Sequence, residues 1–285
     1  MISVVVPVYN EEGAIELFLK ELSLELKHFP KHEIVVVNDG STDSTPEILR
    51  SLSLDNLTII DHAENIGYGK SLLDGLLAAK YECAAIIDGD GSYAPRQIKE
   101  LYAHYPRYDM VVGARQGREY TRGLFKRPAR LLFNYLVKYA TGRKVPDVNS
   151  GLRIFNKNIA LRFKDSLCTG FSFTTTITLL FLLNHYYVKY VPIEYFKRKG
   201  NSKVSHFKDT LRAGQIIVQT IVCYNPVKLF LLLASFNALF GILFSVVNYF
   251  LVHTVFLSIL SAICVSSFIP IFALGLVCER IRKNV

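Results

Sequence analysis

The chain has 285 residues and a formal net charge of +9 at pH 7, and 51% of its residues are hydrophobic. Apart from a long apolar stretch near the C-terminus, this length fits one domain of ordinary size with a full hydrophobic core. The five cysteines are scattered without metal-binding or redox spacing, which argues against a disulfide framework and predicts reduced thiols. The N-terminus enters a strand-like run directly, so no signal peptide is expected.

Apolar, β-rich runs alternate along the first part of the chain with stretches of helical periodicity. The predicted strands are residues 2–9, 33–38, 57–61, 83–88 and 110–113, and the predicted helices are about 12–28, 43–52, 69–80 and 95–104. The strands are continuously apolar, as expected where helices cover both faces of a sheet. The pattern therefore predicts an α/β fold with a mostly parallel sheet.

Polar residues follow four of these strands at their carboxyl ends, where open α/β sheets bind ligands. Asp88 and Asp90 stand one residue apart, a spacing that suits a divalent cation also bound by a diphosphate. Each acidic motif also has a simpler explanation, since Asp-Gly pairs form turns and Ser41 or Asp43 could cap a helix. The placement of residues 38–43 and 88–90 on neighbouring strand ends favours a ligand site.

Glycines at positions 67 and 69 precede Lys70 and Ser71, which suggests a phosphate-binding loop. However, Glu64 stands where a P-loop requires glycine, and Leu72 stands where the dinucleotide-binding motif requires it. Both nucleotide-fold readings fail. The segment still offers flexible backbone at the start of a helix, so residues 65–70 are expected to approach a ligand.

Residues 229–278 contain no Asp, Glu, Lys or Arg. Since about 20 apolar residues span a bilayer, this stretch predicts two transmembrane helices joined near His253 and Thr254. Basic residues flank both ends, so the positive-inside rule places both flanks in the cytoplasm. The alternative is a buried hairpin of a soluble protein, whose helices would normally keep a charged face. The basic stretch 118–130 favours lipid phosphate over nucleic acid, because no recognition motif accompanies it.

Seven motifs occur in order along the whole chain, and together they resemble the family 2 glycosyltransferases of the GT-A fold. They begin at positions 6, 37, 65, 88, 112, 147 and 198, and include Val6-Pro7-Val8-Tyr9-Asn10-Glu11-Glu12 and Asp88-Gly89-Asp90. The resemblance is to the branch that loads sugars onto polyprenyl phosphate, such as dolichyl-phosphate mannose synthases. It implies a GT-A domain at 1–205, an interfacial amphipathic helix at 206–226 and two transmembrane helices at 227–280.

The resemblance also implies roles for single residues. The donor nucleotide would be bound by Pro7, Tyr9, Glu11 and Asp39, and its diphosphate, with Mg²⁺ or Mn²⁺, by Asp88 and Asp90. Arg198 and Lys203 would close over the donor. The lipid phosphate would be bound by Arg115 and Arg130, with Arg127 as the second choice after Arg130. Asp90, Asp147 and Arg115 would be the catalytic residues. Asp147 either contacts the sugar or acts as a base, or it caps the turn at 149–151. Ser92 stands where these synthases commonly carry glutamine.

The predicted activity is that of an inverting glycosyltransferase of the hexosyltransferase type. It would move a sugar from a UDP- or GDP-linked donor to undecaprenyl or dolichyl phosphate, in cell-envelope glycan synthesis at the cytoplasmic face of the membrane. Membrane lipids, a homo-oligomer and a flippase are the further partners expected, and nucleic acid is not. The alternatives are a membrane-tethered transferase for another lipid-linked glycan or a protein, a processive synthase, and a non-catalytic scaffold. The absence of tryptophan argues against the processive synthase, whose motif requires it.

Overall fold

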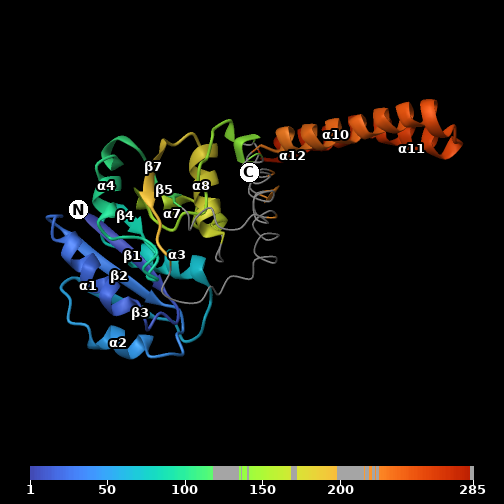
Figure 1. Ribbon diagram of the computed structural model, residues 1–285. Coiled ribbons are helices and arrows are strands. Elements are labelled where there is room, and N and C mark those ends of the chain that lie inside the picture. The colour runs from blue at the N-terminus through green and yellow to red at the C-terminus, as the bar shows by residue number, and fades with distance from the viewer. Residues whose placement is uncertain are drawn as a thin grey trace. The chain divides into compact units, whose positions relative to one another are not determined.

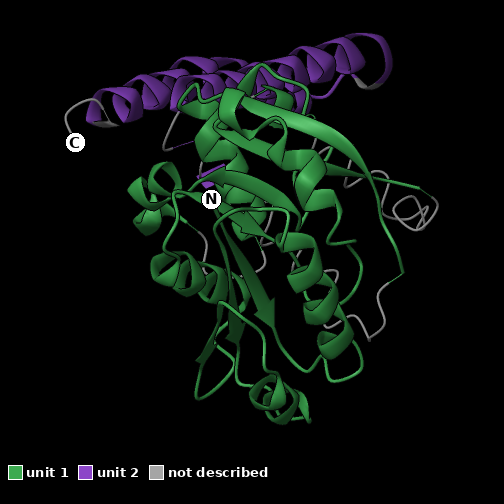
Figure 2. Cartoon of the chain, turned by 90° about the vertical axis from the view of Figure 1, so that its left-hand side faces the viewer, with its two compact units in different colours: residues 1–216 green, residues 217–285 purple. Residues whose placement is uncertain are grey.

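The computed structural model describes residues 1–117, 141–167, 172–197 and 225–282, together with residues 135, 137–139, 215, 218–219 and 222. Contacts divide the chain into two compact units, residues 1–216 and residues 217–285 (Figure 2). The first unit is an α/β domain, and the second is helical. The predicted boundary between 205 and 206 lies outside the described residues, so the three predicted segments stay a prediction.

The first unit is built on a seven-stranded sheet with the strand order β3-β2-β1-β4-β6-β5-β7 (Figure 1). Neighbouring strands are parallel, except that β6 runs antiparallel to both β4 and β5. The mostly parallel sheet that the sequence predicted is therefore confirmed. The strands are β1 (Ile2–Val8), β2 (His32–Asn38), β3 (Leu57–Asp61), β4 (Cys83–Ile86), β5 (Met110–Gln116), β6 (Arg153–Asn156) and β7 (Val188–Glu194).

Each of the four predicted helices is found between the strands that were expected to flank it. They are α1 (Ile15–Leu26), α2 (Thr45–Ser51), α3 (Tyr68–Ala78) and α4 (Gln97–Tyr102). The later elements β6, α7 (Lys157–Arg162), α8 (Phe173–Leu183) and β7 were not predicted. Helix α8 is buried along almost its whole length, so its sequence lacks the polar face that identifies a helix.

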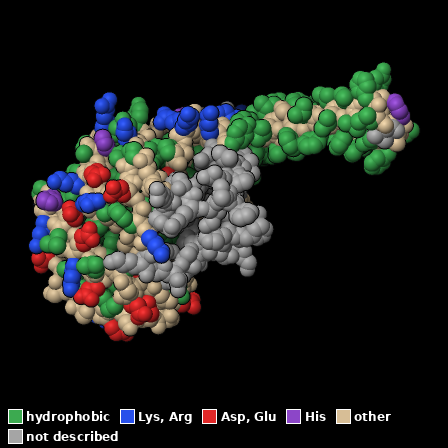
Figure 3. Space-filling view, in the orientation of Figure 1, with side chains coloured by type: hydrophobic (Ala, Val, Ile, Leu, Met, Phe, Trp, Pro, Cys, Tyr) green, Lys and Arg blue, Asp and Glu red, His purple; other side chains and the backbone are tan. Residues whose placement is uncertain are grey.

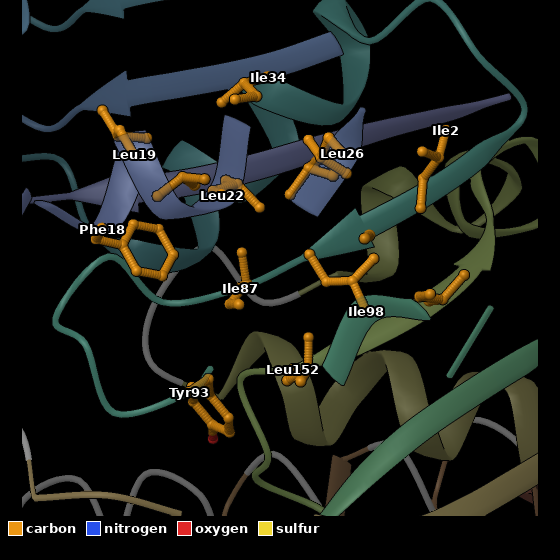
Figure 4. Close-up of a cluster of buried hydrophobic side chains, with 14 of the residues drawn as sticks. Ile2, Phe18, Leu19, Leu22, Leu26, Ile34, Ile87, Tyr93, Ile98 and Leu152 are labelled. Carbon is orange, nitrogen blue, oxygen red and sulfur yellow. The ribbon is translucent and has the colours of Figure 1, made fainter. Parts of the chain in front are cut away.

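The two faces of the sheet are covered by different helices, and the strands are apolar because of it. Alternate residues of β1 and β2, including Val4, Val6 and Val36, pack in one buried cluster with the α1 side chains Phe18 and Leu22 (Figure 4). Helix α3 contacts β1 and β2 at the other face. Since successive strand side chains point to opposite faces, coverage on both sides makes every strand position apolar.

The second unit is a helical hairpin. Helix α10 (Pro226–Val247) continues through one π-helical segment, Asn248–Val252, and the chain reverses at His253, whose φ is 53°. Helices α11 (Val255–Ser266) and α12 (Phe268–Arg282) return along α10. Two helical spans, Pro226–Leu251 and Val255–Ile281, are long and apolar enough to cross a membrane, and hydrophobic side chains dominate their visible surface (Figure 3). The predicted hairpin and its turn are confirmed.

Candidate active site

Hydrogen bonds join the loops that follow β1 and β2. The amide of Asn10 donates to Ser41 Oγ at 2.9 Å, and the amide of Glu11 donates to Thr45 Oγ1 at 2.9 Å. These bonds fix the backbone that carries the side chains expected to bind the nucleotide. The three on this segment, all half-buried at the rim of the sheet, are Pro7, Tyr9 and Glu11.

Asp39 lies at the carboxyl end of β2 and holds the segment that opens α3. Its buried carboxylate accepts the amide of Ile66 at 3.0 Å on one oxygen and the amide of Gly67 at 2.9 Å on the other. Gly40 has a φ of +66°, and a side chain there would overlap the backbone of Glu64. The amides at 66 and 67, which were expected to approach a ligand, therefore bind Asp39.

His62 follows β3 and lies between two carboxylates. Its Nδ1 is 2.9 Å from Asp39 Oδ1, and its Nε2 is 3.2 Å from Asp74 Oδ2, an ion-pair distance without the alignment of a hydrogen bond. Asp74 also binds Lys70 Nζ at 2.5 Å. Asp39 is thus linked through His62 and Asp74 to Lys70.

Asp88 and Asp90 follow β4, and each accepts a hydrogen bond. Asp88 Oδ1 accepts the hydroxyl of Tyr68 at 2.8 Å, and buried Asp90 accepts the amide of Ser92 at 2.9 Å. Burial, followed by the charge of Asp88, raises the pKa of Tyr68 well above its usual value, so the phenol stays a donor. The buried hydroxyl oxygen of Ser92 has no hydrogen-bond partner among the described residues.

The turn at 149–151 packs directly against Asp88. A side chain at Gly151 would overlap the Asp88 carboxylate, so only glycine allows this approach. The amide of Gly151 donates to the hydroxyl oxygen of Tyr93 at 2.7 Å, and the Tyr93 ring meets Tyr195 edge to face with centroids 5.2 Å apart. The turn therefore connects Asp88 to the aromatic pair below Arg115.

Arg115, at the end of β5, forms a bidentate ion pair with Asp147. Its Nε is 2.7 Å from Asp147 Oδ2, and its second terminal nitrogen is 2.9 Å from Oδ1. The guanidinium also lies 5.3 Å from the centroid of the Tyr195 ring. Burial alone would lower the pKa of Arg115, but Tyr93 and Asp147 raise it well above its usual value. Asp147 is therefore the counter-ion of a permanent cation.

Arg153 is the last residue of the motif that begins at Asp147, but no role was predicted for it. Its side chain is fully buried and donates to the carbonyls of Val148, Ser150 and Thr174 and to Thr178 Oγ1. These bonds hold the 148–150 turn against α8. Arg153 is thus a structural cation that places Asp147 and Gly151 at the rim.

The structure links the predicted acids through residues for which the sequence predicted no role. Segment 66–68 joins Asp39 to Asp88, and the 149–151 turn joins Asp88 to the pair of Arg115 and Asp147. Tyr68 stood inside a motif considered only for its glycines. The predicted site residues Arg127, Arg130, Arg198 and Lys203 lie outside the described residues.

Residues 3–163, more than half of the chain, match the model of glycosyl transferase family 2. The chain belongs to glycosyl transferase family 2. It is therefore a glycosyltransferase, and the resemblance stated from its ordered motifs is confirmed. Asp39, Asp88, Asp90 and the Arg115–Asp147 pair all lie within the matched segment.

Two relatives show how the similarity extends along this family 2 glycosyltransferase. Undecaprenyl-phosphate 4-deoxy-4-formamido-L-arabinose transferase of Yersinia pestis is 26% identical over 253 residues, which are 86% of this chain and 74% of that protein. Low-salt glycan biosynthesis hexosyltransferase Agl6 of Haloferax volcanii is 28% identical over 217 residues, which are 74% of this chain and 51% of that protein.

The fold is shared with solved structures. Glucosyl-3-phosphoglycerate synthase of Mycobacterium tuberculosis, in complex with Mn²⁺, uridine diphosphate and phosphoglyceric acid, superposes with a TM-score of 0.62 at 19% identity, covering 78% of each chain. At this identity the likeness concerns the fold. It confirms the GT-A architecture predicted for the first unit.

Proposed function

We propose that this family 2 glycosyltransferase transfers a sugar from a nucleotide-sugar to a polyprenyl phosphate at the cytoplasmic face of a membrane. The observation that carries the proposal is the bidentate pairing of Asp147 with Arg115 beside Asp88. A hydroxyl acceptor needs a base, and Asp147, the strongest candidate for one, has both oxygens engaged by a cation. A phosphate acceptor needs a cation for binding and no base.

The donor would lie across the carboxyl ends of β1, β2 and β4. The nucleoside would be held near Asp39, with its diphosphate at Asp88 and Asp90. The proposed nucleotide contacts on β1 are Pro7, Tyr9 and Glu11. The closing roles of Arg198 and Lys203 stay predictions of the family resemblance.

The residues at the diphosphate position fit Mg²⁺ or Mn²⁺. Asp88 and Asp90 supply carboxylate oxygens, and the Ser92 hydroxyl beside Asp90 is buried without a partner in the described part of the chain. The described residues hold no group of three or more His, Cys, Asp or Glu side chains arranged for a metal. One or two carboxylates with substrate phosphate oxygens are the usual arrangement for Mg²⁺. When bound, the cation would neutralise charge on the departing nucleoside diphosphate.

The acceptor chemistry is a matter of positioning. A phosphate monoester has a second pKa of about 6, so a polyprenyl phosphate is largely ionised at pH 7. Arg115 would orient it by charge-assisted hydrogen bonds, with Arg130 and Arg127 as further proposed contacts. Direct attack of the phosphate oxygen on the sugar carbon is a single displacement and inverts that carbon.

The helical hairpin supports a membrane location for this reaction. Lys228 lies in the first turn of the first apolar span, and Arg280 and Arg282 lie at the end of the second. By the positive-inside rule, these basic residues support a cytoplasmic location of the catalytic unit and both termini. The Yersinia relative, by its name, acts with undecaprenyl phosphate, a membrane lipid. A homo-oligomer and a flippase partner stay predictions.

A donor screen tests the proposal. Purified full-length protein with Mn²⁺ should convert one radiolabelled donor, among UDP-glucose, UDP-linked amino sugars and GDP-mannose, into an organic-extractable product with undecaprenyl or dolichyl phosphate. The matching polyprenol without phosphate is the control acceptor and should give no product. Transfer to a protein or polymer, but never to the lipid phosphate, would reject the proposal.

A further inference from the structure

We propose that Tyr68 is a positioning residue for the donor diphosphate, because its hydroxyl sets the orientation of Asp88. The inference rests on the proposed donor site at the rim. It adds a residue that touches neither the sugar nor the diphosphate and acts through a carboxylate that does.

The first support is the direct contact. Tyr68 is the first residue of α3, and its hydroxyl donates to Asp88 Oδ1 at 2.8 Å across the end of β4. The tyrosine side chain is half-buried, and so is the carboxylate that it meets. A hydrogen bond to a charged group contributes more than a neutral one, so this contact favours one rotamer of the carboxylate.

The second support is that the other Asp88 oxygen is also restricted. Gly151 approaches so closely that any side chain there would meet Asp88 Oδ2. The carboxylate is thus enclosed by the Tyr68 hydroxyl on one oxygen and the 149–151 turn beside the other. Loss of the hydroxyl would release one of these two restraints and leave the backbone in place.

The third support is that the backbone carrying Tyr68 is anchored by another donor-site acid. Asp39 accepts the amides of Ile66 and Gly67, the two residues directly before Tyr68. Three consecutive residues therefore contact Asp39 and Asp88, the two acids of the proposed donor site. This short segment would fix the spacing between the two halves of the donor site.

The test is a double-mutant cycle on nucleotide binding, measured by calorimetry on the full-length protein with Mn²⁺. The probe is UDP, or GDP if wild type binds GDP more tightly. Tyr68→Phe should weaken binding of the diphosphate about tenfold and that of the corresponding monophosphate less than twofold. In an Asp88→Asn background, Tyr68→Phe should cause no further change, because its route of action is already removed.

Tyr105→Phe is the matched control. Tyr105 is a half-buried tyrosine whose hydroxyl contacts the thiol of Cys83. Cys83 is the first residue of β4, whereas Asp88 follows the last residue of that strand. This variant should bind the diphosphate as wild type does, and thermal unfolding should show that both tyrosine variants are folded.

If wild type binds the nucleotide normally, two results would overturn this inference and leave the proposed donor site standing. One is a diphosphate affinity of Tyr68→Phe within twofold of wild type. The other is that Tyr68→Phe weakens diphosphate binding as much in the Asp88→Asn background as it does in wild type. If wild type binds neither UDP nor GDP, the proposed donor site itself is rejected, and the inference with it.

Discussion

The two units of the chain treat buried polar groups differently. In the catalytic unit, the guanidinium of Arg153 is fully buried and makes five hydrogen bonds. In the hairpin, Asn237 donates one bond to Ser267 Oγ at 2.5 Å, and Ser261 donates one to the carbonyl of Gly241 at 2.7 Å. The first network holds the 148–150 turn against α8, whereas the second joins two helices.

The apolar groups show the reverse distribution. The strands of the catalytic unit enclose their apolar side chains, whereas Leu251 and Phe256 in the hairpin are 77% and 72% exposed. In water such a surface would be costly, but in hydrocarbon it is the favourable arrangement, and helices there associate through packing and single interhelical hydrogen bonds. From this comparison we expect that losing a polar group in the first unit has a large effect. Losing one in the hairpin should have only a weak effect on its stability.

The largest expected effect is at Asp90. Asp90→Asn keeps the size of the side chain but removes its charge, so turnover should fall by roughly 10²-fold or more, the usual cost of losing one electrostatic group in such a site. Steady-state rates at varied Mn²⁺ measure it. Asp55→Asn, an exposed acid outside the rim, is the control and should keep the wild-type rate. Undiminished activity of Asp90→Asn, or of wild type in EDTA, would contradict the metal role.

The next effect concerns stability. Arg153→Met should destabilise the catalytic unit by about 3 kcal/mol, because the carbonyls that Arg153 binds would stay buried without donors. Urea unfolding followed by tyrosine fluorescence measures it. Arg162→Met, at an exposed position on α7, should change stability by less than about 0.5 kcal/mol. Equal effects in the two variants would show that the buried network is not essential.

A smaller effect should separate the two substrates. Arg115→Ala is expected to raise the KM for polyprenyl phosphate about tenfold, the size of one charge-assisted hydrogen bond, and to leave nucleotide affinity unchanged. Asp39→Ala should weaken nucleotide binding and leave the KM for polyprenyl phosphate unchanged. Arg115→Lys controls for the buried charge of Asp147, although it loses the bidentate geometry and should recover activity only in part. Loss of nucleotide binding in Arg115→Ala with normal lipid dependence would reverse our placement of the substrates.

The smallest effect is expected in the hairpin. Asn237→Leu should cost only about 0.6 kcal/mol of helix association, the average for interhelical hydrogen bonds in membranes, and should change turnover less than twofold. Thermal unfolding in detergent and the lipid-transfer assay measure both. Leu239→Ala, a substitution at an exposed position on the same helix, is the control variant with which Asn237→Leu is compared. A tenfold loss of turnover in Asn237→Leu would break the contrast between the units.

Local patterns were enough to predict the first five strands, their helices and the hairpin. Continuous apolar runs mark doubly covered strands, and an uncharged stretch such as 229–278 has few alternatives. Strand β6 and the uniformly buried helix α8 were missed, because the first has only two apolar residues, between Arg153 and Asn156, and the second has no polar face. Both depend on neighbours that come from distant parts of the chain.

The sequence by itself determined which acids stand at strand ends, since the alternation of strands and helices places residues such as Asp39 and Asp88 at one edge of a parallel sheet. Only the tertiary structure decided what those acids bind. Asp39 meets amides 27 and 28 residues away, Tyr68 reaches Asp88 over 20 residues, and Arg115 meets Asp147 over 32. Such pairings depend on how packed elements bring side chains together, which the periodicity of a segment does not encode. The sequence left Asp147 either a sugar contact or base, or a cap of the 149–151 turn. In the fold it accepts the amide of Asn149 at 3.3 Å, as a cap does, and it is also the counter-ion of Arg115.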